Sequence, residues 1–252
     1  MNEERFTGKA EVYKKHRPSY ADKFIEYLYS EIGFKKGSII ADIGAGTGIF
    51  SEILLKKDSF VYLVEPNSDM FEAAKKNMSA YLENKRCEFV NAPAERTALA
   101  DNSIDFITAA QAFHWFDRES FKNECIRILK PNGKVILVWN VRVLDSGFII
   151  ENDEINRKYC DNYKGFSAGH IFDNSEEYKG FFKKVEYREF ENNLYFDLEG
   201  FTGRNLSSSY APKIGTETAE LYSNELETLF YKYEKNGKVM MPNITVSYVG
   251  EF

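Results

Sequence analysis

Short apolar segments alternate with amphipathic segments over the first 140 residues of the chain. Five runs are dense in Ile, Val, Leu and Phe and have the length of buried strands: residues 38–43, 60–64, 87–90, 104–108 and 134–139. Between them, apolar residues recur every three or four positions, as they do along amphipathic helices. This alternation predicts a mostly parallel sheet with helices on both faces.

Capping residues predict where several helices begin. Ser19 with Asp22 three positions later is the spacing of a capping box, and Gly33 and Gly37 follow the apolar stripe of that helix. The run 66–68 predicts the start of a helix over roughly 70–80. Asp117 is expected to cap a helix whose inner face carries Phe121, Cys125, Ile128 and Leu129.

Beyond Asn140 the strict alternation stops. Residues 141–180 are rich in Asn, Asp, Tyr and Gly and are interpreted as an insertion or cap with short helices. A strand over 185–196, a helix over 217–234 and a last strand over 238–249 are expected after it. We therefore predict a single domain, 1–252: a lid segment 1–20, a core 38–140, the insertion 141–180, and a C-terminal completion of the sheet, 181–252.

Composition and charge exclude several function classes. The chain has 252 residues, 43% of them hydrophobic, with a net charge of −6 and a pI of about 5.4, so no general attraction to nucleic acid is expected. The longest apolar runs are of strand length, so we expect no membrane span. The three cysteines show no metal or redox spacing, and the first residues resemble no signal peptide, which favours a cytoplasmic protein without a metal site.

A glycine-rich loop follows the first predicted strand: Asp42-Ile-Gly44-Ala45-Gly46-Thr-Gly48. Ligands of open α/β sheets bind at this edge, where glycines permit close backbone approach and a helix N-terminus offers free N–H groups. The dinucleotide fingerprint needs Gly or Ala where this chain has Ile49. Asp42 would repel a pyrophosphate but attract the ammonium and sulfonium charges of S-adenosylmethionine.

Glu65 ends the second predicted strand, 21 residues after Gly44. A carboxylate there can accept hydrogen bonds from both hydroxyls of a ribose. Together the loop and this acid predict S-adenosylmethionine as the cofactor. A nicotinamide-dependent oxidoreductase is disfavoured by Asp42 and Ile49.

The combination of the glycine loop, residues 64–67, and Ala94-Glu95 ahead of 101–105 resembles the class I S-adenosylmethionine-dependent methyltransferases. Residues 13–20, 111–117 and 207–212 are similar to a narrower group of small-molecule enzymes typified by trans-aconitate methyltransferase. The resemblance implies a Rossmann-like sheet of seven strands with the last strand antiparallel. It also implies a cofactor site formed by Asp42, Gly44, Ala45, Gly46, Gly48, Glu65, Pro66, Met70, Ala94, Glu95 and Gln111. Ala92-Pro93 departs from the pattern, which removes a side-chain contact to adenine.

The segment after the fourth predicted strand, Gln111-Ala-Phe-His114-Trp115-Phe116, is expected to line the methyl-transfer site. His114 is the candidate catalytic residue, as a base for a hydroxyl or as a partner of a carboxylate. Trp115, Tyr13, Arg17 and Tyr210 are candidates for the substrate pocket, with Arg204 a weaker one.

These observations predict transfer of a methyl group to a small molecule, most simply to a carboxylate oxygen, which needs no base. Two alternatives stay open: a non-catalytic S-adenosylmethionine-binding protein, and an O- or N-methyltransferase that uses a general base. The identity of the acceptor and the oligomeric state are left open by the sequence.

Overall fold

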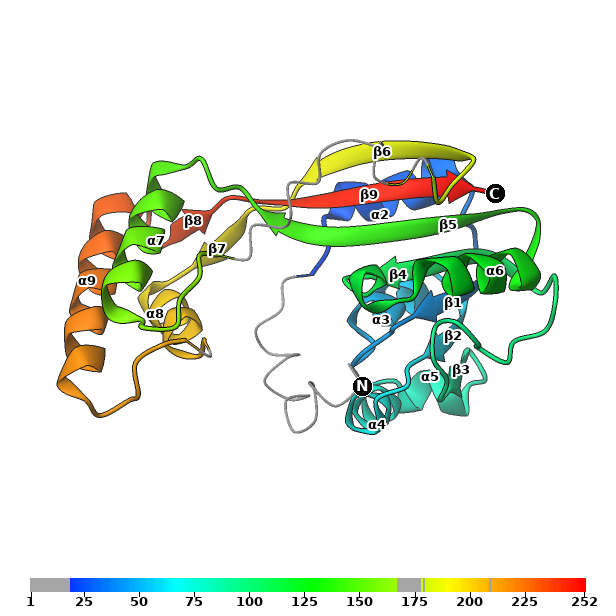
Figure 1. The fold of residues 1–252 in the computed structure, drawn as a ribbon, viewed down its shortest axis with the longest axis horizontal. Coiled ribbons are helices and arrows are strands. Elements are labelled where there is room, and N and C mark those ends of the chain that lie inside the picture. Colours follow the sequence, from blue (N-terminus) through cyan, green and yellow to red (C-terminus); the bar gives the residue numbers. More distant parts are fainter. Residues whose placement is uncertain (1–18, 167–177, 179, 209) are drawn as a thin grey trace. The chain divides into compact units, whose positions relative to one another are not determined.

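The predicted alternation of strands and helices is present in the computed structural model, which describes residues 19–166, 178, 180–208 and 210–252. The strands of this part are β1 (Ile39–Ile43), β2 (Phe60–Val64), β3 (Cys87–Val90), β4 (Ile104–Ala110) and β5 (Leu129–Arg142). The helices are α2 (Asp22–Tyr27) with a π-helical turn (Leu28–Ile32), α3 (Ile49–Lys56), α4 (Ser68–Asn77), α5 (Ser79–Glu83) and α6 (Arg118–Ile128). Figure 1 shows these elements in order from blue to green.

A seven-stranded sheet joins these strands in the order β3-β2-β1-β4-β5-β9-β6, where β6 is Lys184–Glu191 and β9 is Asn243–Glu251. The neighbouring strands from β3 to β5 are parallel. The N–H of Lys183 donates to the carbonyl of Glu251, and that of Asn192 to the carbonyl of Asn243, so β6 and β9 run in opposite directions. The predicted sheet of seven strands with an antiparallel last strand is confirmed.

The first helix begins differently from the prediction. Its N-cap is Ala21, with no side-chain cap, so the capping box of Ser19 and Asp22 is wrong. The N–H of Ala21 instead donates to Oγ1 of Thr245, 224 positions away, at 3.0 Å. A tertiary hydrogen bond therefore takes the place of the expected local one. The predicted end is confirmed, because Gly33 has the left-handed φ of 105° that favours glycine.

The chain divides into two compact units. Unit 1 holds the described residues of 1–139, 173–190 and 245–252, and unit 2 those of 140–172 and 191–244. The second unit thus combines most of the predicted insertion with most of the predicted C-terminal segment, and the boundary expected at 180 does not separate them.

The described part of unit 2 contains three helices and a small sheet. The helices are α7 (Gly147–Tyr159), α8 (Leu198–Leu206) and α9 (Glu217–Tyr233), and the sheet pairs β7 (Leu194–Phe196) with β8 (Val239–Met241) in antiparallel fashion. Figure 1 shows α7 beside α9, and the two helices pack together. Helix α7, with 13 residues, lies in the segment 141–180 where short helices were expected. The strands predicted over 185–196 and 238–249 are each split into two. The first is interrupted at Asn192-Asn193, and the second at Pro242, which lacks an N–H.

Each unit has an apolar core of its own. In unit 1, Phe24 and Leu28 of the first helical segment pack with Phe50 and Leu54 of α3 against Val61 and other strand residues. Phe121 and Cys125 of α6 are also fully buried. In unit 2, Phe148 of α7, Phe201 of α8 and Phe230 of α9 share one cluster with Val239. Cys87, Cys125 and Cys160 are free and buried, as expected.

Candidate functional site

Three glycines give the loop between β1 and α3 its shape, each for a different reason. Gly44, Gly46 and Gly48 have φ of 70°, 58° and 84°, a region that favours glycine. A Cβ on Gly44 would lie 2.5 Å from Cβ of Ala112, so this glycine permits close packing of the segment after β4. A Cβ on Gly46 would meet no atom of residues 19–166, 178, 180–208 or 210–252 within 4 Å, so these parts of the chain leave space for a ligand beside its backbone. Gly48 is the N-cap of α3.

Asp42 lies at the end of β1 and is fully buried. In the sheet register it stands next to Thr108 of β4, whose Oγ1 donates to Asp42 Oδ1 at 2.8 Å. Ser51 of α3 donates from Oγ to Oδ2 at 2.5 Å. Burial raises the pKa of Asp42 to about 6, the charge of Glu65 adds to this, and the two hydroxyl hydrogen bonds lower it. The carboxylate is thus held by the scaffold, and its charge would act on a ligand across a distance.

Glu65 follows β2, and its carboxylate joins two backbone segments. Oε2 accepts from the N–H of Gly46 at 2.8 Å, and Oε1 accepts from the N–H of Asn67 at 2.9 Å. Asn67 is the N-cap of α4, and its Oδ1 accepts from the N–H of Met70 at 3.0 Å. Met70 itself is buried. The acid predicted to bind a ribose is therefore fixed beside the glycine loop by main-chain donors.

The loop after β3 reaches the same edge of the sheet. Nδ2 of Asn91 donates to the carbonyls of Glu65 and Pro66, at 3.0 and 3.3 Å. Ala94 is buried. Oε1 of Glu95 accepts from the N–H of Asp117, the N-cap residue of α6, at 2.8 Å. Glu95 therefore connects the loops that follow β3 and β4.

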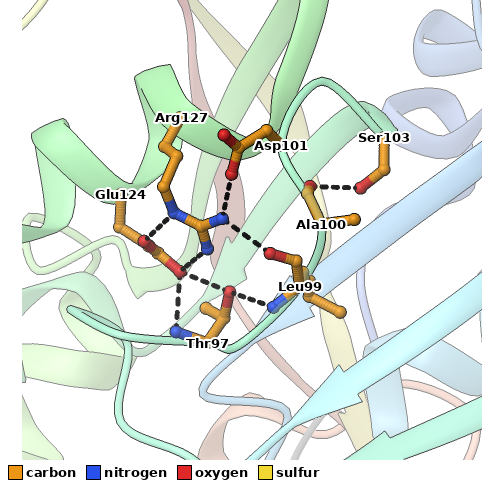
Figure 2. Close-up of polar contacts among 7 residues, drawn as sticks. All are labelled: Thr97, Leu99, Ala100, Asp101, Ser103, Glu124 and Arg127. Carbon is orange, nitrogen blue, oxygen red and sulfur yellow. Dashed lines mark hydrogen bonds and ion pairs between the residues drawn. The ribbon is translucent and has the colours of Figure 1, made fainter.

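A polar network clamps the rest of the β3–β4 connection onto α6 (Figure 2). Glu124 Oε1 accepts from the N–H and Oγ1 of Thr97, at 2.7 and 2.5 Å, and both of its oxygens accept from Arg127. Arg127 also donates to the carbonyl of Leu99 at 2.7 Å and to Asp101 at 2.5 Å. Burial alone would raise the pKa of Glu124, but the bonds from Arg127 and Thr97 outweigh it and hold the pKa below its usual value.

The segment after β4 packs against the glycine loop, where Ala112 lies next to Gly44. Gln111 has a left-handed φ of 59°, unusual for a non-glycine residue, and its N–H donates to the carbonyl of Val138 at 2.8 Å. A short 3₁₀-helix, Phe113–Trp115, follows. Phe113 is buried, Trp115 is partly buried and His114 is exposed. The rings of His114 and Trp115 lie 4.7 Å apart.

The predicted site residues fall into three groups. The cofactor candidates, with His114 and Trp115, all belong to unit 1. Tyr210 and Arg204 belong to unit 2, where Tyr210 packs edge-on against Tyr163 with ring centroids 4.8 Å apart. Tyr13 and Arg17 lie outside the described residues.

Sequence reasoning missed the residues that hold the acids. Ser51 and Thr108, the partners of Asp42, are fully buried polar residues, and Asn67 and Asn91 fix the segment around Glu65. A signal existed for two of them: Ser51 interrupts the inner face of α3, and Thr108 is a hydroxyl residue within a strand of apolar residues. The bond from Thr108 to Asp42 could be identified only once the sheet register was known, and the bond from Ser51 only once α3 was placed against β1.

No group of three or more His, Cys, Asp or Glu side chains is arranged to hold a metal ion within the described parts of the chain. In the same parts, no helix has the length and apolar character needed to cross a membrane.

Comparisons with known proteins agree with this arrangement. A family model described as a methyltransferase domain matches residues 41–137. An uncharacterised methyltransferase of Schizosaccharomyces pombe is 34% identical over 131 residues, which are 52% of this chain and 50% of that protein. One of Mycobacterium tuberculosis is 31% identical over 144 residues, which are 57% of this chain and 55% of that protein. The chain therefore spans about half the length of these relatives.

Solved structures show the same fold. A protein of Anaeromyxobacter dehalogenans assigned as a type II methyltransferase has a TM-score of 0.66 at 20% identity, over 93% of this chain and 97% of that one. Phosphoethanolamine N-methyltransferase 2 of Haemonchus contortus, solved with S-adenosylhomocysteine, has a TM-score of 0.51 at 16% identity, over 91% of this chain and 52% of that one. Residues 41–137 match the methyltransferase domain model, and the sheet around them has the same fold as these solved structures.

Proposed function

We propose that this protein transfers the methyl group of S-adenosylmethionine to a carboxylate oxygen of a small molecule. The observation that carries the proposal is the Glu65 carboxylate, held between the N–H groups of Gly46 and Asn67 beside the accessible backbone of Gly46. An acid in this position suits the two hydroxyls of a ribose. The net charge of −6 supports a small-molecule acceptor over nucleic acid.

The residues of this edge fit the cofactor. The open space beside Gly46 admits a ligand close to the backbone, Glu65 is in place for the ribose, and the buried Asp42 supplies negative charge toward the ammonium and sulfonium groups. Met70, Ala94 and Glu95 lie on the two segments assigned to the adenine. When bound, S-adenosylmethionine supplies a methyl group already activated as a sulfonium.

The protein's part in the reaction is alignment. In-line displacement at an activated methyl group gains several kcal/mol from holding the nucleophile in position. A carboxylate is ionised at neutral pH and needs no base. His114, exposed on its 3₁₀-helix next to Trp115, is then a group that holds the acceptor rather than one that takes its proton.

Cofactor binding is tested by thermal denaturation with S-adenosylhomocysteine and, separately, NAD. A ligand at a hundred times its dissociation constant adds about 2.7 kcal/mol, so S-adenosylhomocysteine should raise the melting temperature and NAD should not. Glu65→Gln should weaken the effect, while Glu72→Gln on the exposed surface of α4 serves as the matched control. Equal melting temperatures with and without S-adenosylhomocysteine would overturn the cofactor assignment.

Methyl transfer is tested with methyl-labelled S-adenosylmethionine and a panel of carboxylic acids, phenols and amines. We expect a labelled product, cleaved by base as an ester is, from the acids. Label in phenols or amines would favour the base-assisted alternative. Cofactor binding without transfer to any class would favour a binding protein.

The role of His114 is tested by the pH profile of the maximal rate in wild type and His114→Ala. If a protonated His114 holds a carboxylate, activity falls as pH rises and the imidazole loses its proton, and the variant chiefly raises KM. If neutral His114 is a base, activity rises with pH, and the variant loses roughly 10²–10⁴-fold in rate. Profiles equal in shape and height would leave His114 as a wall residue.

A further inference from the structure

A second charged group with unusual surroundings lies in unit 2. Arg142 ends β5, and its guanidinium lies over the ring of Phe166, 4.0 Å from the ring centroid. Among the described residues, no carboxylate lies within ion-pair distance of Arg142, whereas the neighbouring Arg157 pairs with Asp153. Burial lowers the pKa of Arg142, and the nearby Tyr210, Tyr163 and Asp153 oppose that shift.

Asp153 is the carboxylate that acts on Arg142, but both of its oxygens already accept hydrogen bonds from other residues. Oδ2 accepts from Nε of Arg157 at 2.6 Å, and Oδ1 accepts from the hydroxyl of Tyr163 at 2.5 Å. The N–H of Phe166 also hydrogen-bonds to Asp153. This acid therefore fixes the segment that carries Tyr163 and Phe166 to α7, and it does not pair with Arg142.

The walls around Arg142 are aromatic with hydroxyl groups. Tyr163 packs edge-on against Tyr210, with ring centroids 4.8 Å apart, and against Phe166 at 5.6 Å. The inner face of α7 carries a buried amide, Asn156, whose side chain lies beside the hydroxyl of Tyr163. Its Oδ1 accepts from the hydroxyl of Tyr222 at 2.6 Å, but its Nδ2 has no acceptor among the described residues.

Within the described parts of the chain, Arg142 thus has no anion and the Asn156 amide N–H₂ no acceptor. A desolvated guanidinium and a buried amide in that state are both costly to a folded protein. Both costs are removed by one kind of ligand. A carboxylate matches the planar fork of arginine in bidentate fashion and also accepts from amide and phenol groups. The aromatic walls suit the carbon skeleton that carries such a group.

We propose that Arg142, stacked on Phe166 and flanked by Tyr163, Tyr210 and Asn156, forms a binding subsite in unit 2 for a carboxylate of a small organic acid. This inference rests on the proposed function, because it assigns the methyl acceptor to the class of small organic acids. It also gives Tyr210, a candidate for the substrate pocket, a definite neighbour in Arg142.

The test is calorimetric titration of the full chain, saturated with S-adenosylhomocysteine, with benzoate and with glutarate. At least one acid should bind wild type more tightly than its uncharged amide does. Arg142→Gln should weaken the binding of that acid at least tenfold, Arg142→Lys should weaken it less, and Lys232→Gln, which removes an exposed cation of the same unit, should leave it unchanged. All four proteins should bind S-adenosylhomocysteine equally.

Asn156→Asp provides a second variant with little change of shape. It keeps the oxygen that accepts from Tyr222 and replaces the amide donor by a negative oxygen, so acid binding should again fall at least tenfold. This variant decides the matter if Arg142→Gln does not fold.

Three results would overturn the subsite: no binding of either acid to wild type, equal binding to wild type and the Arg142 variants, or tighter binding of inorganic phosphate than of both acids. Failure of the cofactor assignment is a separate result. It is seen when S-adenosylhomocysteine does not bind, and the titrations are then repeated without it, where dependence on Arg142 can still be measured.

Discussion

Asp42 in unit 1 and Arg142 in unit 2 are both charged groups withdrawn from water, and they are treated in opposite ways. Asp42 has a hydroxyl donor on each oxygen, supplied by Ser51 and Thr108. Arg142 has an aromatic ring below it and no carboxylate at ion-pair distance among the described residues. The difference indicates that the loop of unit 1 is built in advance, whereas the cluster of unit 2 is completed by a ligand.

Replacing a glycine of the loop between β1 and α3 by alanine should produce the largest effect on stability. Gly44→Ala combines a φ of 70° with a Cβ 2.5 Å from Ala112, and we expect a loss of about 3–4 kcal/mol. Gly46→Ala is the matched control, since its φ is 58° but its Cβ meets nothing, and about 1 kcal/mol is expected. Urea denaturation of both variants checks this. Equal losses would mean that Gly44 is not packed against the segment after β4.

The buried charge of Asp42 should lower the stability of the ligand-free protein, and binding of the positively charged cofactor should restore that stability. Its pKa of about 6 in the folded protein exceeds the ordinary 3.8, so the folded state holds the proton more tightly than the unfolded state. The resulting stability is fully present below the lower value and is lost as pH rises through the upper one, by roughly 3 kcal/mol. Asp42→Asn should therefore be more stable than wild type at pH 7 by up to about that amount, and about equal at pH 4.

Asp42→Asn should weaken the binding of S-adenosylhomocysteine and of S-adenosylmethionine by unequal amounts. Only the latter carries a sulfonium charge, so we expect its affinity to fall more, by about tenfold or greater. In wild type, S-adenosylmethionine should bind more tightly as pH rises through about 6, because Asp42 ionises. Titrations of both compounds between pH 5 and pH 8 measure this. A pH-independent affinity would show that Asp42 exerts no charge effect on the ligand.

The ion pair of Glu124 and Arg127 in unit 1 is expected to have an effect of intermediate size. Both residues bond to other groups of the same unit. Glu124→Ala leaves the N–H of Thr97 without its acceptor, and a loss of about 2 kcal/mol is expected. The pKa of Glu124 lies below the ordinary 4.5, so its contribution is present above that value and is lost as pH falls further. Thermal denaturation at pH 7 and at pH 3 checks both points. Glu119→Ala, at an exposed position of the same helix, is the control.

The smallest effect is expected from a buried amide of unit 2. Neither amide atom of Asn152 has a hydrogen-bond partner among the described residues. Asn152→Leu should therefore stabilise the ligand-free protein by about 1 kcal/mol. Denaturation without ligand tests this, and a loss of stability would indicate that the amide is satisfied in the native protein, which would weaken the contrast between the units.

The sequence by itself determined the core of unit 1. The alternation of apolar runs and amphipathic stretches predicts the strands, because buried parallel strands read as continuous apolar segments. Asp117 as a helix cap, Gly33 as a helix end and the glycine loop were all predictable, since each depends on backbone preferences within a few residues. The edge of the sheet that carries the candidate site follows from the same local signals.

Only the tertiary structure decided which groups meet across the fold. Thr108 reaches Asp42 through the pairing of β1 with β4, and Thr245 replaces Ser19 at the first helix across more than two hundred residues. Arg142 and Phe166 lie in a segment that shows no periodic pattern, so their contact had no signal in the sequence. Hydrogen bonds and stacking between distant residues depend on register and packing, which a one-dimensional pattern of apolar and polar positions does not encode.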